Sequence, residues 1–129
     1  MTFSPGFLEA VKEAAGNNNL SLETDEQRWT CYIGIDGYNP IAVTDIVENL
    51  GSASVVIEDL GEMLSKKTDA FDLYMIIVKN MGFYSVALTD NRYVVYSVPV
   101  HDYGRMVDAL KEVCAACDYY DSIKDRIIN

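Results

Sequence analysis

The sequence predicts an α+β fold in which helices cover mainly one face of an antiparallel sheet of about five strands. Three patterns support this prediction. Apolar residues recur at helical spacing near both ends of the chain, two short early runs alternate apolar and polar residues, and further strand-like runs follow after residue 72. The predicted order of elements is α-β-β-α-α-β-β-β-α. Because no linker or internal repeat interrupts the sequence, we expect a single domain over residues 1–129.

The first predicted helix has recognisable ends, and a β-hairpin is predicted to follow it. Ser4 suits the N-cap, Pro5 suits the first helical position, and Gly16 marks the end. The runs 20–24 and 28–36 then place apolar residues at every second position, which is the periodicity of strands with one buried face. Together these two runs predict the hairpin.

Two helices are predicted in the middle of the chain. The stretch 39–51 starts with Asn-Pro, ends at a glycine and repeats apolar residues at helical spacing. The stretch 53–67 is ambiguous, because the consecutive β-branched residues 55–57 favour a strand whereas the wider apolar pattern fits a helix interrupted by Gly61. We predict a helix because the stretch is long for a strand, and the strand remains the alternative.

A three-stranded meander and a long helix are predicted for the rest of the chain. The runs 72–79, 83–88 and 92–100 are rich in β-branched and aromatic residues, and turn-forming residues separate them. From Asp102 to the C-terminus, apolar residues again recur at helical spacing. This pattern predicts the final helix.

The C-x-x-C pair of Cys114 and Cys117 is interpreted as core packing. A redox pair needs its first thiol at a helix N-terminus, where the helix dipole lowers the thiol pKa, and Cys114 lies well inside the predicted helix. Zinc is the alternative, since Cys31 and His101 would complete a Cys₃His set with this pair. Both cysteines of the pair fall within the apolar stripe of the helix, where cysteine behaves as a small apolar residue. We therefore expect no metal and no other cofactor.

The sequence carries no catalytic or nucleotide-binding signature. It contains no G-x-S-x-G nucleophile elbow and no glycine-rich phosphate loop, and its one histidine, His101, precedes Asp102, which is better explained as a helix N-cap. We therefore expect a protein that is not an enzyme. The N-terminus lacks the pattern of a signal peptide, no apolar run is long enough to cross a bilayer, and the cysteine count is odd. These features predict a cytoplasmic protein with reduced thiols.

Negative charge is the most unusual property of the chain. The formal net charge is −10, from 20 acidic and 10 basic residues, which disfavours direct binding to nucleic acids or anionic membranes. Residues 36–72 contain eight of the acids, so we expect an anionic surface on the two predicted middle helices. The residues assigned to this partner-binding surface, with one tyrosine expected to be exposed on the last helix, are Asp45, Glu48, Glu58, Asp59, Glu62, Asp69, Asp72 and Tyr119.

These observations lead to one principal hypothesis and two alternatives. The principal one is a non-enzymatic protein whose acidic helices occupy the basic groove of a partner protein, which by analogy of charge would be a nucleic-acid enzyme. The protein would then act as an inhibitor or nucleic-acid mimic, of the kind that phages use against restriction or CRISPR nucleases. One alternative is an immunity protein that neutralises a toxin by charge complementarity. The other is a metal- or small-ligand-binding domain built on Cys31, His101, Cys114 and Cys117.

Overall fold

The computed structural model describes residues 2–16, 19–61, 70–82 and 85–128. Within these residues it confirms the predicted α+β class, because six strands form one antiparallel sheet and three α-helices pack against it. The helices are α1 (Phe7–Ala15), α3 (Ala70–Met81) and α4 (Met106–Ile128), with two short 3₁₀ helices, η2 (Glu26–Arg28) and η3 (Tyr103–Arg105). The strands are β1 (Asn19–Asp25), β2 (Thr30–Ile35), β3 (Ile41–Val47), β4 (Leu50–Asp59), β5 (Val86–Thr89) and β6 (Tyr93–Val100).

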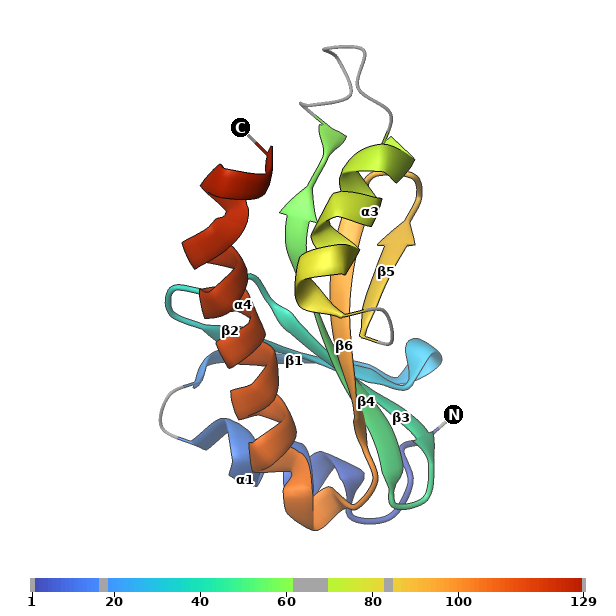
Figure 1. The fold of residues 1–129 in the computed structure, drawn as a ribbon. Coiled ribbons are helices and arrows are strands. Elements are labelled where there is room, and N and C mark those ends of the chain that lie inside the picture. Colours follow the sequence, from blue (N-terminus) through green and yellow to red (C-terminus); the bar gives the residue numbers. More distant parts are fainter. Residues whose placement is uncertain (1, 17–18, 62–69, 83–84, 129) are drawn as a thin grey trace.

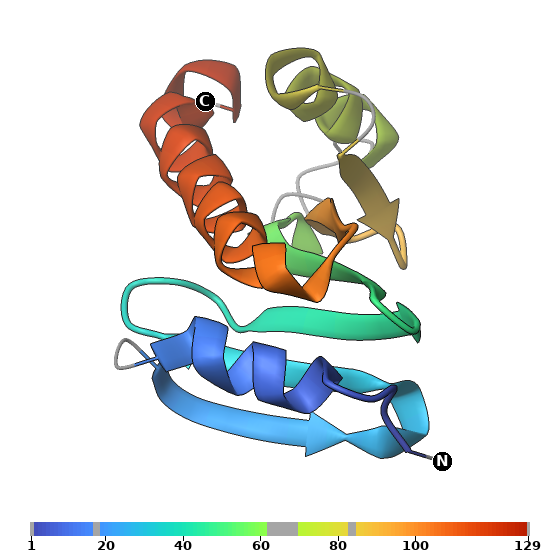
Figure 2. The same cartoon turned by 90° about the horizontal axis from the view of Figure 1, so that it is seen from below.

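The described strands lie in the order β1-β2-β3-β4-β6-β5, and each neighbouring pair is antiparallel (Figure 1). Strands β1 to β4 follow one another as a meander, and β5 and β6 form a hairpin that joins the sheet through β6. Inward-facing residues of the strands form one core cluster with apolar residues of all three helices. The helices therefore share one face of the sheet, as predicted. Helix α4 packs along β4 and β6, and α1 lies beside the N-terminal end of α4 (Figures 1 and 2).

The predicted helix over 39–51 is wrong, because this stretch forms β3, a tight turn and the start of β4. Ile41 and Val43 are buried at every second position, which is the strand period. The residues that suggested a helical face include Ile46 and Val47, and both are 56% exposed near the hairpin tip. Asn49 adopts a positive φ of 66° in the turn, a conformation that asparagine tolerates well.

The ambiguous stretch resolves into the strand alternative as far as residue 59, so the predicted helix over 53–67 is wrong there. Burial alternates along β4, and its inward positions include the small residues Gly51 and Ala53. A Cβ atom on Gly51 would lie 2.6 Å from the carbonyl oxygen of Thr44 on β3, so glycine permits the close pairing of the two strands. Residues 62–69, the remainder of the predicted helix, lie outside the described residues.

The predicted strand over 72–79 is also wrong, because these residues belong to helix α3. Leu73, Ile77 and Val78 are buried and recur at helical spacing, while Phe71 and Ile76 are exposed. Strands β5 and β6 and the final helix α4 are confirmed, with residues 83 and 84 of the predicted run outside the described residues. The predicted meander of three strands is therefore a hairpin of two, preceded by a helix.

A buried carboxylate joins three segments at one end of the sheet. Asp45 on β3 is only 5% exposed. Its Oδ2 atom accepts the backbone N–H of Ser4 at 2.7 Å, and its Oδ1 atom accepts the hydroxyl of Tyr103 at 2.8 Å. The backbone of Ser4 thus donates to Asp45, and the predicted N-cap is wrong, because Gly6 and not Ser4 is the N-cap of α1. Because buried polar groups require partners, this arrangement holds the N-terminal segment and η3 against β3.

Replacing Asp45 with asparagine is expected to lower the free energy of unfolding by about 2 kcal/mol, because the amide offers one acceptor oxygen where two donors converge. Urea unfolding followed by circular dichroism measures the loss. The matched control is Glu48→Gln in the following turn, which is exposed and should change the free energy by less than about 0.5 kcal/mol. Equal stabilities of the two variants would contradict the role of Asp45.

Candidate functional site

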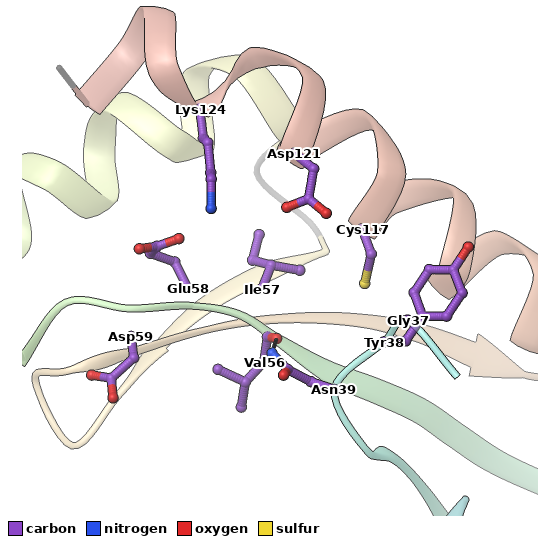
Figure 3. Close-up of a pocket in the computed structure, with 10 residues that line it drawn as sticks. All are labelled: Gly37, Tyr38, Asn39, Val56, Ile57, Glu58, Asp59, Cys117, Asp121 and Lys124. Carbon is purple, nitrogen blue, oxygen red and sulfur yellow. Dashed lines mark hydrogen bonds between the residues drawn. The ribbon is translucent and has the colours of Figure 1, made fainter. Parts of the chain in front are cut away.

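A polar cleft opens between α4 and the last part of β4 (Figure 3). Its volume is about 470 Å³, and we call it the α4–β4 cleft. It brings together three carboxylates, an amine, a phenol and a thiol, and such a convergence of polar groups in a hollow is typical of binding and catalytic sites. The lining residues come from the β2–β3 loop, β4 and α4, and they are Gly37, Tyr38, Asn39, Val56, Ile57, Glu58, Asp59, Cys117, Asp121 and Lys124.

A bulge in β4 supplies the floor of the cleft. The pairing register between β4 and β6 shifts between Val56 and Glu58. Such a bulge re-aims side chains, and Figure 3 shows Ile57 and Glu58 both directed towards α4 while Val56 points away. Because of the bulge, a carboxylate stands beside an apolar core residue on the covered side of the sheet.

Glu58 is held in place by a buried tyrosine of α4. The hydroxyl of Tyr120 donates to Oε2 of Glu58 at 3.1 Å, and the Tyr120 side chain has no exposed surface. Burial is the main reason that the pKa of Tyr120 lies far above its ordinary value, with the neighbouring Glu58 charge adding to the shift. Tyr120 is therefore a permanent hydrogen-bond donor at neutral pH.

The β2–β3 loop forms hydrogen bonds with both walls of the cleft. The hydroxyl of Tyr38 donates to Oδ2 of Asp118 on α4 at 3.0 Å, and Nδ2 of Asn39 donates to the carbonyl oxygen of Val56 at 2.7 Å. The hydrogen bond to Asp118 raises the pKa of Tyr38. This loop thus closes one side of the cleft.

The thiols near the cleft are poor nucleophiles at neutral pH. Burial raises the pKa of Cys117, which lines the cleft, to about 11, and it also raises the pKa of Cys114 one turn earlier. Nearby aspartates, including Asp118, add to both shifts. Since the thiolate is the reactive form, protonated thiols support the interpretation of the C-x-x-C pair as packing.

The acidic residues assigned to one surface lie in several places. Asp45 is buried and so does not belong to an exposed surface, and Glu48 is exposed in the β3–β4 turn at the other end of β4 from the cleft. Glu58 and Asp59 both line the cleft. Asp72 is exposed in the first turn of α3. The structure therefore brings Glu58 and Asp59 together at the cleft, whereas Asp45 and Glu48 lie towards the other end of β4.

Asp59, the second cleft carboxylate on β4, is ion-paired. Asp59 is bound by Arg92, whose Nε and Nη2 atoms donate at 2.6 and 2.9 Å, and these bonds hold the pKa of Asp59 below its usual range. Tyr119 is 50% exposed on α4, as predicted. Glu62 and Asp69 lie outside the described residues.

The four possible zinc ligands do not converge. Cys31 is buried in β2, His101 is exposed after β6, and Cys114 and Cys117 lie on α4. Among the described residues, no group of three or more histidine, cysteine, aspartate or glutamate side chains could hold a metal ion. The described part of the chain therefore contains no preformed site of the proposed Cys₃His kind.

Helix α4 contributes Asp121 to the lining of the cleft, and the sequence patterns did not single this residue out. Asp118 and Asp121 are exposed, and neither they nor Glu58 form a salt bridge with a described residue. Among the residues that the structure describes, Lys124 is the one cationic residue that lines the cleft. The spacing of Asp118, Asp121 and Asp125 along one side of a helix was the available signal, and it was hidden by the larger count of acids in residues 36–72.

Alkylation should report the raised thiol pKa. With a folded pKa near 11, Cys117 should react with iodoacetamide at pH 8 on the order of a hundred-fold more slowly than the same residue in urea, where its pKa is about 8.5. Peptide mass spectrometry follows Cys117 and Cys114 separately. Because the folded pKa lies above the unfolded one, the stabilising effect of the neutral thiol is complete below about pH 8.5 and is lost as the pH rises towards 11. Equal rates in the folded and unfolded protein would contradict the protonated state.

None of the described helices is both long enough and apolar enough to cross a membrane. Comparison of the chain with protein-family models and with curated protein sequences gives no match. The geometry of the cleft and the charge of the chain are therefore the grounds on which a function is argued.

Proposed function

We propose that this chain is a non-enzymatic protein-binding domain that uses acidic residues of the α4–β4 cleft to occupy a basic groove of a partner protein. The observation that carries the proposal is that Glu58 of β4 and Asp121 of α4 line the same cleft, while Asp118 lies one turn before Asp121 and binds the cleft residue Tyr38. None of these three carboxylates forms a salt bridge with a described residue. A basic surface that normally binds nucleic acid is the natural target, because its lysines and arginines already bind anions. The protein would then act as an inhibitor of that partner.

Electrostatics give a physical reason for this arrangement. Uncompensated like charges repel one another and lower stability, so a set of neighbouring carboxylates is favoured when a cationic partner neutralises it. Asp118 and Asp121 follow one another on α4 at an interval of about 4.5 Å along the helix axis. Neighbouring anionic groups on a rigid helix can replace backbone phosphates in a basic groove and speed the encounter with it.

The proposed surface differs from the one expected from the sequence. The middle of the chain contributes Glu58 and Asp59 to it, and Asp59 is already neutralised by Arg92. Helix α4 contributes Asp118 and Asp121, so the acidic binding surface is centred on the last helix. Lys124 provides an opposing charge that would orient an approaching partner.

Charge reversal on α4 is the direct test. The double variant Asp118→Lys/Asp121→Lys should reduce capture of a basic partner from the source cells by at least about tenfold at low salt, since each lost ion pair in a desolvated interface costs on the order of 1 kcal/mol or more. Immobilised protein, quantitative mass spectrometry and elution with increasing salt measure the effect.

The matched control reverses two exposed carboxylates away from the cleft and changes the net charge equally. Glu23→Lys/Glu26→Lys alters β1 and η2 and should retain the partner. Duplex DNA added in excess should displace the wild-type protein if the occupied groove binds nucleic acid. Equal capture by both double variants would refute the proposed surface, and retention of the partner in excess DNA would refute the nucleic-acid groove.

A further inference from the structure

A second hollow lies on the other side of the β2–β3 loop, between α1 and α4. Two adjoining cavities of about 400 and 300 Å³ share Ala14 and Val107 as lining residues, so they form one groove along the contact of the two helices. We call it the α1–α4 groove. Its floor is apolar, and the residues of that floor are Ala10, Ala14, Ile35, Val107, Leu110 and Cys114. Val107 is 41% exposed, although it belongs to this apolar floor.

The two rims of the groove carry opposite charges. Glu9 and Glu13 stand one turn apart on α1 and line one part, and Asp36 of the β2–β3 loop lines the other. Lys111 of α4 lies on the opposite rim. Glu9, Glu13 and Lys111 form no salt bridge with a described residue. An occupant that complements this pattern has apolar residues in the centre, cationic residues facing α1 and a neutral or acidic flank facing α4.

We propose that the α1–α4 groove binds an amphipathic helix of the partner protein, with its basic flank on the α1 side. A helix presents apolar residues at i, i+3, i+4 and i+7, which suits a groove between two helices. Lysine or arginine residues four positions apart on the same helix meet Glu9 and Glu13, which have the same spacing. The spacing of the rim carboxylates and the apolar floor together favour a helix over an extended segment.

The groove and the α4–β4 cleft meet at one residue. Tyr38 lines both hollows and is fastened to α4 through Asp118. A single partner can therefore contact the cleft with cationic side chains and the groove with its helix. The inference rests on the proposed function in one respect, which is that the partner is basic.

A synthetic helix of about fifteen residues, roughly 22 Å long, tests the groove without knowledge of the partner. It carries leucines at i, i+3, i+4 and i+7, lysines on one flank and glutamates on the other. Titration into ¹⁵N-labelled full-length protein should shift the amide resonances of Ala10, Ala14, Val107 and Leu110. A second peptide with the same leucines but glutamates on both flanks should bind at least about tenfold more weakly.

Two variants of the protein identify the binding residues. Val107→Asn should weaken binding of the lysine peptide at least about fivefold, because it removes an apolar contact from the floor. The matched control is Ile76→Asn on α3, where the wild-type side chain is 38% exposed and lies outside the groove, and it should bind as the wild type does. Glu9→Lys/Glu13→Lys should reverse the preference, so that the all-glutamate peptide binds more tightly. This reversal cannot result from loss of folding.

The outcomes separate this inference from the proposed function. Three results would each contradict helix binding at the α1–α4 groove. They are resonance shifts confined to another surface, equal effects of Val107→Asn and Ile76→Asn on peptide binding, and no reversal of peptide preference in Glu9→Lys/Glu13→Lys. If Asp118→Lys/Asp121→Lys still reduced partner capture in that case, the proposed function of the cleft would be retained without the groove. If the peptide bound at the groove while Asp118→Lys/Asp121→Lys left partner capture unchanged, the proposed role of the cleft would be refuted. The proposed role of the groove would be retained.

Discussion

Burial of apolar residues on a single face of the sheet is the constraint on which the rest of the structure depends. The inward residues of the strands form one cluster with α1, α3 and α4, so the three helices must share that face. Helix α4 covers the two long central strands, β4 and β6, and the other helices pack at its sides (Figure 2). Hollows therefore form where α4 meets its neighbours, and the cleft and the groove both lie beside this helix.

The acidic composition is best understood from this arrangement. Carboxylates on α4, α1 and the β2–β3 loop surround hollows that are partly apolar, so charge and apolar contact occur side by side. In the proposed interaction, long-range attraction would increase the rate of encounter with a cationic partner, and desolvation of an apolar floor would supply affinity. Asp45 is the exception, because its carboxylate is buried and serves the N-terminal segment and η3. Counting acids along the chain does not separate these two roles.

Patterns of sequence predicted several features correctly. The first hairpin, the terminal helices, β6 and the antiparallel α+β class follow from periodicity, and the apolar position of Cys114 and Cys117 follows from the stripe of α4. The stretches 41–59 and 72–79 were assigned the opposite type of structure. Both are mostly apolar or β-branched, and such runs satisfy the helical and the strand period at once. Their partners in the sheet or the core decided between the two.

The sequence by itself determined the acidic character and the α+β class of the chain, because composition and local periodicity are properties of neighbouring residues. Only the tertiary structure decided that Glu58 meets Tyr120 and Asp121 at the cleft, and that α1 and α4 enclose a groove. These contacts join residues far apart in the chain, and the bulge in β4 that aims Glu58 leaves no mark on the hydrophobic pattern. Long-range packing fixes the position of such groups, and local preference does not encode it.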